Sequence, residues 1–184
     1  LYATAGHSAG TLISAKQHQG KPLSFNNIAD ANAALECAKA LDGAGCVIVK
    51  HANPCGVSLN QDAEQAYQQA YACDPTSAFG GIIAFNSEIS AAAAKAIVAQ
   101  QFVEVVVAPS YAKGAVEAFS SKKNVRVLET GPFDSADKGG RIIQQVEGGM
   151  LVQDKDVEDV SREDLKVVSK RKPSKQEIDD ALLA

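Results

Sequence analysis

The sequence has little aromatic material: tryptophan is absent, methionine occurs once and aromatic residues make up 5% of the 184 positions. The core must therefore be built mainly from Ala, Val, Ile and Leu. Long hydrophobic runs are lacking too, since the longest, around residues 78–85 and 105–108, fall far short of the roughly 20 residues that a membrane-spanning helix needs. No basic and then apolar leader opens the chain. We therefore expect a cytoplasmic protein with no membrane partner.

Neither sign of charge is in large excess, because 18 Lys and Arg stand against 22 Asp and Glu and give a net charge of −4. This mild acidity argues against a protein whose main function is to bind nucleic-acid phosphates. The four cysteines, at positions 37, 46, 55 and 73, include no pair with the two-residue gap of a zinc-binding loop. We expect reduced thiols, no zinc and no nucleic-acid partner.

Short β-branched runs alternate with helical patterns through the middle of the sequence. Strands are predicted at residues 11–17, 46–50, 82–85, 104–108 and 125–128, and helices at 28–41, 62–73, 91–101 and 111–120. This order predicts an α/β fold with a mainly parallel sheet and helices packed on its faces. In such sheets ligands bind beyond the carboxyl ends of the strands, so the residues just after Lys50, Phe85 and Ala108 are the places to search.

The pattern weakens in the last third of the chain, which separates an α/β unit at residues 1–130 from a segment at 131–184. In the second part, Ser174 and Glu177 form a capping pair ahead of a helical pattern. The chain opens without an initiator methionine, and this last helical pattern stops at the final residue without a Gly, a Pro or a basic last turn. We therefore expect a piece of a larger protein.

The richest candidate site follows the strand predicted at 46–50, where Lys50 and His51 begin the stretch KHANPCG. An ammonium group disfavours protonation of a neighbouring imidazole, which leaves the imidazole able to accept a proton near neutral pH. The Lys itself can stabilise an oxyanion that develops in a transition state. The plain alternative is a solvated Lys at a strand end and a His hydrogen-bonded to a sharp turn at Pro54 and Gly56. From spacing alone, this plain alternative is favoured.

Two further stretches carry residues of the kind that bind ligands. Paired glycines end the stretch DPTSAFGG, which contains Phe79 and Gly80, and they allow a close backbone approach to a ligand, although a tight turn explains the same pattern. Asn27, in GKPLSFNN, is either a helix cap or an amide that reads the edge of a heterocycle. Glu104 opens an apolar strand and is either an edge charge in solvent or an acceptor aimed at a ligand.

Five stretches, in one order, resemble the family of bifunctional purine biosynthesis proteins, which join an AICAR transformylase to an IMP cyclohydrolase. They are QGKPLSFNNIADANAALE, VIVKHANPCGV, DPTSAFGGIIAFN, QFVEVVVAP and GGMLVQD. The resemblance covers the first half of the transformylase region and implies a cytidine-deaminase-like three-layer α/β/α fold. It also implies that residues 131–184 are a connecting segment that leads to a second such unit, missing from this sequence. The implied reaction transfers a formyl group from 10-formyltetrahydrofolate to the 5-amino group of AICAR, on the route to IMP.

The resemblance also implies roles for individual residues. His51 matches the proton acceptor of the family, and Lys50 matches its transition-state stabiliser. Phe79 is expected to pack beside the site. Some family members have Asp where this chain has its glutamate at 104. Three residues fall where the family contacts the AICAR nucleotide: Asn27, Gly80 and Glu104.

Several parts of the family's site lie outside this sequence. An Arg-Tyr-Gly segment that helps to hold the nucleotide is expected just before Leu1, and the folate contacts, a further Asn and a potassium site are expected in a second half beyond Ala184. The resemblance also implies a site formed at a homodimer interface, and the IMP cyclohydrolase domain is absent from this chain. We therefore expect the chain alone to bind AICAR weakly and to transfer no formyl group.

Two other interpretations remain open. A zinc-dependent deaminase-type hydrolase needs a Glu two residues after its first ligand and then a Pro-Cys-x-x-Cys stretch. Here His51 is followed two residues later by Asn53, and the Pro-Cys pair at 54–55 has no second Cys at the required spacing. The other alternative is a non-catalytic folded or dimerisation module.

Overall fold

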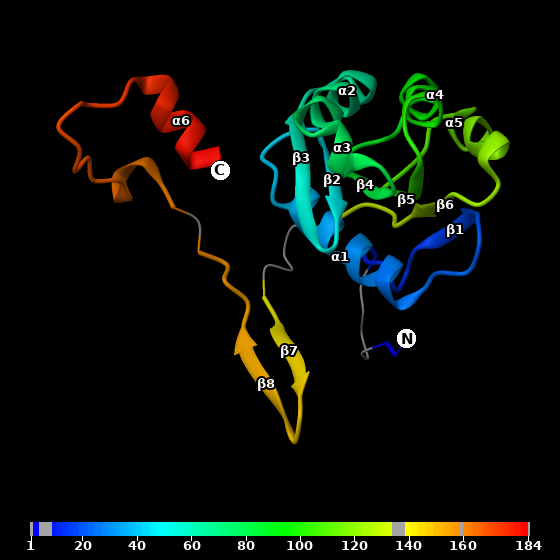
Figure 1. The fold of residues 1–184 in the computed structure, drawn as a ribbon, viewed down its shortest axis with the longest axis horizontal. Coiled ribbons are helices and arrows are strands. Elements are labelled where there is room, and N and C mark those ends of the chain that lie inside the picture. The colour runs from blue at the N-terminus through cyan, green and yellow to red at the C-terminus, as the bar shows by residue number, and fades with distance from the viewer. Residues whose placement is uncertain (1, 4–8, 134–138, 159, 184) are drawn as a thin grey trace. The chain divides into compact units, whose positions relative to one another are not determined.

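The computed structural model describes the chain except for residues 1, 4–8, 134–138, 159 and 184 (Figure 1). The chain divides into two compact units, Leu1–Asp134 and Ser135–Ala184, which we call the first and the second unit. This division falls a few residues beyond the boundary that the sequence pattern predicts at 130. Each unit has its own secondary structure, and the candidate site belongs to the first.

The first unit is built around a six-stranded sheet with helices on both faces (Figure 1). In sheet order, the strands are β1 (Lys16–Gln19), β6 (Arg126–Glu129), β5 (Val103–Ala108), β4 (Gly81–Phe85), β2 (Gly45–Lys50) and β3 (Asn53–Leu59). The helices are α1 (Phe25–Lys39), α2 (Ala63–Cys73), α3 (Pro75–Ala78), α4 (Ala91–Gln100) and α5 (Ala115–Ala118). Helix α1 packs on one face, whereas α2, α4 and α5 lie on the other. The predicted three-layer α/β/α architecture is confirmed.

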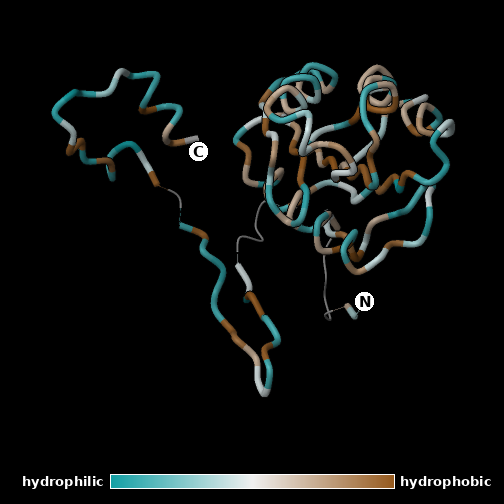
Figure 2. Tube along the Cα trace, viewed as in Figure 1, coloured by the Kyte–Doolittle hydropathy of each residue, from teal (hydrophilic) through white to brown (hydrophobic). Residues whose placement is uncertain are grey.

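The central strands need cover on both faces because they are continuous apolar runs. In β2, Val47 and Val49 pack with α1, whereas Cys46 and Ile48 pack with α2, and all four side chains are fully buried. Figure 2 shows hydrophobic positions gathered in these inner strands of the first unit. Burying one Val or Ile side chain contributes about 1.5–3 kcal/mol. A strand with no polar face is therefore stable only between two layers of helices.

Strand direction within the sheet decides where the candidate site forms. Strands β3, β4, β5 and β6 point the same way, so the sheet is mostly parallel, as predicted. Strand β1 runs antiparallel to β6, and β2 runs antiparallel to both of its neighbours, β3 and β4. As a result, β2 carries Lys50 toward the amino end of β4.

Strand β3 is the main element that the sequence pattern does not predict. Pro54 and Gly56 suggest a sharp turn, but the chain turns earlier and returns as an edge strand paired with β2. A proline is tolerated on an edge strand, and the register shift between Ile48 and Val49 marks a bulge beside it in β3, where Cys55 is the extra residue. Gly56 is required because a Cβ there would lie 2.0 Å from the carbonyl oxygen of Ala70 in α2.

Two predicted elements are shorter than expected. The opening strand begins at Lys16 and not at residue 11, because Thr11 and Ser14 form a hydrogen-bonded turn through their hydroxyl groups. The helix predicted at 111–120 is reduced to α5 and a following 3₁₀ turn at Phe119–Lys122. Gly114 causes this late start, since its φ of 84° lies outside the helical region.

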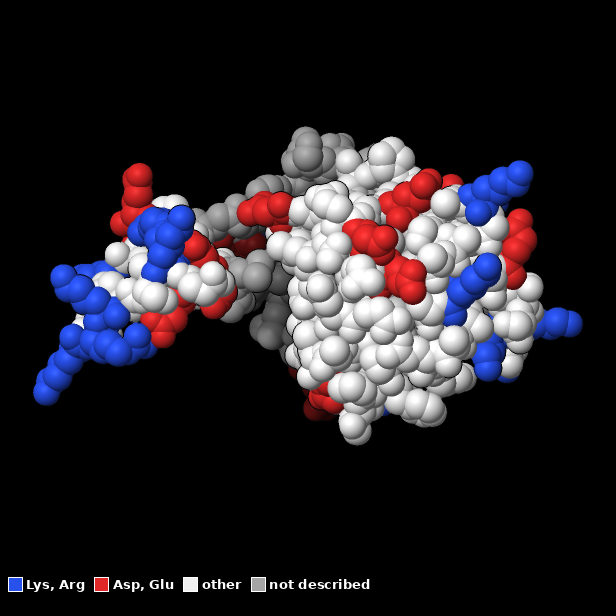
Figure 3. Space-filling model, turned by 90° about the horizontal axis from the view of Figure 1, so that it is seen from above, with Lys and Arg blue, Asp and Glu red and all other residues white. Residues whose placement is uncertain are grey.

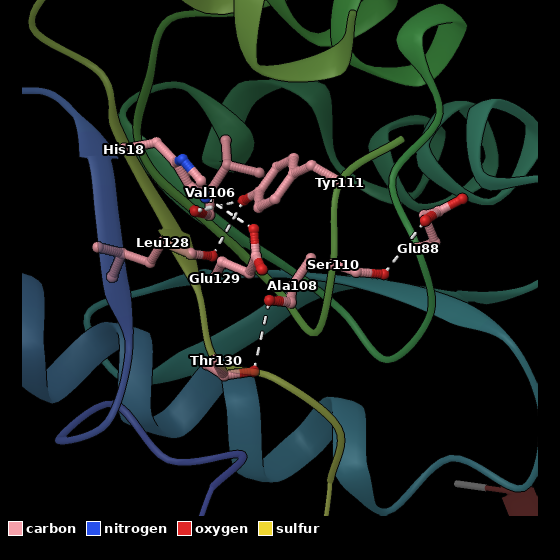
Figure 4. Close-up of polar contacts among 9 residues, drawn as sticks. All are labelled: His18, Glu88, Val106, Ala108, Ser110, Tyr111, Leu128, Glu129 and Thr130. Atoms are coloured by element: carbon pink, nitrogen blue, oxygen red, sulfur yellow. Dashed lines mark hydrogen bonds and ion pairs between the residues drawn. The ribbon is translucent and has the colours of Figure 1, made fainter. Parts of the chain in front are cut away.

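His18 joins the edge strand β1 to β6 (Figure 4). Its Nε2 lies 2.7 Å from Oε2 of Glu129, and its ring packs edge-on against Tyr111 with centroids 5.9 Å apart. The Tyr111 hydroxyl shares its one proton between the carbonyl oxygens of Val106 and Leu128, at 3.0 and 3.1 Å. Burial raises the pKa of this hydroxyl well above its usual value. These contacts fasten the carboxyl ends of β5 and β6 to each other and to the edge strand.

The second unit contains a β-hairpin and a helix. Strands β7 (Arg141–Val146) and β8 (Gly149–Asp154) pair antiparallel, and α6 (Lys175–Leu183) follows a 3₁₀ turn at Arg162–Asp164. The predicted capping pair is confirmed, because the Glu177 N–H donates to Ser174 Oγ at 3.2 Å and the Ser174 N–H donates to a Glu177 carboxylate oxygen at 2.7 Å. Hydrogen bonds from the Arg171 guanidinium lower the pKa of Glu177 to about 2.

Charged side chains are dispersed over the face of the first unit that α2, α4 and α5 cover. Figure 3 shows this face, on which acidic side chains are spread among neutral ones and basic side chains lie toward one border. The dispersal agrees with the small net charge of the sequence. Among the residues described, no helix has the length and apolar character needed to cross a membrane.

Candidate functional site

A hollow of about 460 Å³ opens beside the end of β2 in the first unit. It forms where this strand end meets the loop before β4, the start of β5 and the first turns of α1. The six predicted site residues all line it, although Asn27 and Glu104 are 77 positions apart in the sequence. The complete lining is Ser24, Asn26, Asn27, Asp30, Lys50, His51, Phe79, Gly80, Ile82, Phe102 and Glu104.

The hollow lies where the sequence places its richest candidate site, directly after Lys50. The other two positions to search, after Phe85 and Ala108, lie at the opposite edge of the sheet, because β2 runs antiparallel to β4 and β4 is parallel to β5. Val49 pairs with Ile82, so the chain leaves β2 beside the amino end of β4. Strand β5 is parallel to β4 and begins at the same end. The candidate site is therefore built on one carboxyl end and two amino ends.

His51 occupies a strained hairpin turn between β2 and β3. Lys50 pairs with Asn53, which leaves His51 and Ala52 as a two-residue turn with φ values of 54° and 59°. Turns with positive φ at both central residues favour Asn and Gly, and each other residue held there costs about 1–2 kcal/mol. The turn is held by the Ala52 N–H, which donates to Asp30 Oδ1 at 2.9 Å, and by the Asn53 amide, which donates to the His51 carbonyl at 2.8 Å. Strain of this kind is concentrated at functional sites.

Lys50 connects the turn to the loop before β4. The residue is half-buried, and its ammonium donates to the carbonyl oxygen of Phe79 at 2.7 Å. An ammonium group has three N–H donors, so this bond fixes the side chain and leaves further donors for a ligand. A fixed positive charge and an exposed imidazole therefore lie on successive residues at one wall of the hollow.

Asn27 and Glu104 form a second polar wall. Helix α1 starts three residues earlier than predicted, so Ser24 is its cap and Asn27 closes the capping box, with N–H···O distances of 3.1 Å in both directions. The Asn27 amide also donates to Glu104 Oε2 at 2.8 Å, and the Arg126 guanidinium lies 3.7 Å from the same oxygen. Asn27 thus serves as a cap and faces the hollow as well, and Glu104 is a paired acceptor. The sequence pattern gave no signal for Arg126.

Phe79 and Phe102 form an exposed aromatic wall. Their ring centroids are 5.4 Å apart, and 62% and 54% of their surfaces are exposed. Gly80, between Phe79 and the start of β4, adopts a φ of 74°, and its N–H donates to the carbonyl oxygen of Phe102, just before β5, at 2.8 Å. The turn that the paired glycines predict is therefore present, and it brings backbone to the hollow. Exposed aromatic faces are surfaces against which a flat heterocycle stacks.

Hydrogen-bonding and acid–base groups dominate the hollow. Burial raises the pKa of the Cys55 thiol on β3, which disfavours the reactive thiolate. In the parts of the chain that the structure describes, no three His, Cys, Asp or Glu side chains gather closely enough to hold a metal ion. The hollow therefore offers an imidazole, an ammonium, an amide, carboxylates and aromatic surface to a polar ligand.

Fold and site together define an α/β protein with a polar, aromatic-walled hollow. The model of the AICARFT/IMPCHase bienzyme family matches residues 1–184 of this sequence. The chain belongs to the AICARFT/IMPCHase bienzyme family, an enzyme family of purine biosynthesis. The resemblance identified from the sequence motifs is thereby confirmed.

Proposed function

We propose that the first unit forms part of an AICAR transformylase site, which transfers a formyl group from 10-formyltetrahydrofolate to the 5-amino group of AICAR. The observation that carries this proposal is the meeting of six residues in one hollow. Membership of the bienzyme family supports the class of reaction. The six residues are Asn27, Lys50, His51, Phe79, Gly80 and Glu104.

His51 is the proposed proton acceptor. The AICAR amine is a weak nucleophile because its lone pair is delocalised into the imidazole ring and toward the carboxamide. Its nitrogen attacks the formyl carbon, and the His51 imidazole takes the amine proton as the new C–N bond forms. The bond between the formyl carbon and N10 then breaks, and N10 takes up a proton to give tetrahydrofolate. The exposed position of His51 at a turn supports this role, because the imidazole is accessible to a ligand.

Lys50 is the proposed transition-state stabiliser. During attack the formyl oxygen gains negative charge, and a nearby ammonium lowers the energy of that tetrahedral state. The bond from Lys50 to Phe79 supports this role because it holds the charge in place before the reaction begins. A preorganised charge needs little reorientation as the oxyanion develops.

The opposite walls of the hollow are the proposed nucleotide contacts. Asn27 and Glu104 supply amide and carboxylate groups that match the donors and acceptors of a carboxamide or a ribose. Gly80 lets the backbone approach the ligand, and Phe79 offers a ring face to the heterocycle. Holding the amine and the formyl group together supplies a further large part of the rate enhancement.

We further propose that 10-formyltetrahydrofolate is held mainly by the other half of the transformylase region of a homodimeric enzyme, outside this sequence. Two exposed rings that line the hollow support an additional protein surface there: Phe79 and Phe102 are 62% and 54% exposed. Exposed apolar clusters of this kind mark binding surfaces. No zinc is proposed, and a potassium site is proposed only for the further half of the enzyme outside this sequence.

Calorimetric titration of the purified chain with AICAR tests the proposal. We expect weak but saturable binding, which His51→Ala weakens about tenfold, a loss of about 1.4 kcal/mol. Lys95→Ala, an exposed change on α4, is the matched control and keeps the wild-type affinity. An absence of saturable binding would instead favour a non-catalytic module, and one bound zinc per chain would favour a deaminase-type hydrolase.

A further inference from the structure

We propose that Asp30 is a positioning residue, whose carboxylate holds the hairpin turn so that the His51 imidazole lies at the wall of the hollow. The consequence for AICAR binding rests on the proposed function, whereas the effect on the turn does not. Asp30 lies on α1, and both it and His51 line the hollow.

The need for such a residue follows from the backbone of the turn. His51 and Ala52 both have positive φ, and neither is a glycine or an asparagine that adopts this conformation easily. In a free chain these residues relax to negative φ, which would redirect the His51 side chain. The pairing of Lys50 with Asn53 closes the turn, and a contact from another part of the fold can offset its strain.

Asp30 supplies that interaction from a different layer of the fold. Its Oδ1 accepts a hydrogen bond from the Ala52 N–H at 2.9 Å, across 22 positions of sequence. A hydrogen bond to a carboxylate is stronger than one between neutral groups. The other bond at the turn, from the Asn53 side chain to the His51 carbonyl, is local and cannot fix the turn against α1.

Helix α1 is a firm support for this contact. Ala31 and Ala34 on α1 are fully buried against the sheet, and the capping box of Ser24 and Asn27 fixes the start of the helix. The same helix carries Asn27 and Asp30, so it sets the positions of a proposed nucleotide contact and of the His51 turn together. The spacing of Asn27 and Asp30 on this helix therefore fixes the position of the His51 turn relative to the wall formed by Asn27 and Glu104.

Three variants of the 184-residue chain separate this role from general stability. Asp30→Ala removes the acceptor, Asp30→Asn keeps an acceptor oxygen but loses the charge, and Asp42→Ala removes an exposed carboxylate after α1 as the control. A residue with positive φ gives a strong nuclear Overhauser effect between its own amide and Hα protons. This signal at His51 and Ala52 reports the conformation of the turn. Replacing a residue that contributes only to the overall stability of the fold would leave the signal unchanged in the folded protein.

We expect Asp30→Ala to lose the strong signal at both residues and to speed amide exchange at Ala52 about tenfold. Its AICAR affinity falls about tenfold, whereas Asp30→Asn stays within about threefold of the wild type and Asp42→Ala is unchanged. If the signal persists in a folded Asp30→Ala, the proposal is wrong. If the signal is lost while AICAR still binds with full affinity, Asp30 does not position the site. If the wild type binds no AICAR, the proposed function fails, and the signals at the turn still decide whether Asp30 holds it.

Discussion

The Nζ of Lys50 lies 2.7 Å from the carbonyl oxygen of Phe79, and this bond joins the end of β2 to the loop that precedes β4. The two segments meet because β2 runs antiparallel to β4, with Val49 opposite Ile82. A parallel β2 would have carried Lys50 to the opposite edge of the sheet, away from Gly80. The direction of one strand therefore brings the candidate base and cation to the glycine turn.

Gly56→Ala is expected to destabilise the first unit. Its Cβ would lie 2.0 Å from the Ala70 carbonyl oxygen, so β3 and α2 must move apart. We expect a loss of about 2–3 kcal/mol in the free energy of unfolding, measured by urea denaturation. Gly43→Ala is the matched control, because its nearest contact is the end of the Leu59 side chain at 3.8 Å. Equal stability of the two variants would contradict the close packing of β3 on α2.

His18→Ala is expected to loosen the edge strand β1. The change removes the hydrogen bond to Glu129 and the edge-on contact with the Tyr111 ring. A loss of about 1–2 kcal/mol is expected from these partly buried contacts. His18→Gln, which retains a hydrogen-bonding side chain, should recover part of the loss, and AICAR binding should be unaffected in both variants. His18 lies at the sheet edge opposite to the hollow. Weakened AICAR binding in a stable His18 variant would therefore contradict an AICAR site at the end of β2.

Acid is expected to unfold α6 through Glu177. The pKa of Glu177 is lowered from 4.5 to about 2 by the Arg171 guanidinium and the Ser174 cap. A carboxyl group whose pKa is lowered by folding stabilises the folded state above its unfolded pKa, and this contribution is lost as pH falls through the folded value. The amide signals of α6 should therefore show loss of helix between about pH 4.5 and pH 2.

The matched variant for this acid transition is Glu177→Gln. It lacks the titrating group, so its α6 should be less stable at neutral pH and should change little across the same interval. An acid transition of equal size in Glu177→Gln would show that another group is responsible.

The purified chain is expected to release no tetrahydrofolate from 10-formyltetrahydrofolate and AICAR. The proposed folate contacts lie outside the sequence, so the formyl donor is not held near the His51 imidazole. Absorbance or mass-spectrometric detection of tetrahydrofolate measures this directly. Release that disappears in His51→Ala would show that the chain is already a complete transferase.

The strands of the inner sheet could be predicted because their signal is local. Runs such as CVIVK and EVVVA are apolar and β-branched throughout, and β2 and β5 begin within one residue of the predicted starts. Strand β3 could not be predicted in this way, since Pro54 and Gly56 are typical turn residues. Its stability depends on contacts with β2 and on the space that Gly56 leaves for α2.

The arrangement of the candidate site could not be predicted from local sequence patterns either. Spacing alone favoured a solvated Lys50 and gave no reason to group it with Asn27 or Glu104, because their proximity depends on strand direction and helix packing. The family resemblance named these residues, and the structure adds the geometry that joins them. Asp30 and Arg126 were missed because each acts through a long-range hydrogen bond or ion pair that no local pattern encodes.

Residue-resolved nuclear magnetic resonance during AICAR titration is the most direct test of the proposed site. The amide and side-chain signals of Asn27, His51, Gly80 and Glu104 should shift together with one saturation curve, while those of Thr130 at the opposite edge stay fixed. Shifts centred on Thr130, or none at His51 under saturating AICAR, would contradict an AICAR site built on Lys50 and His51.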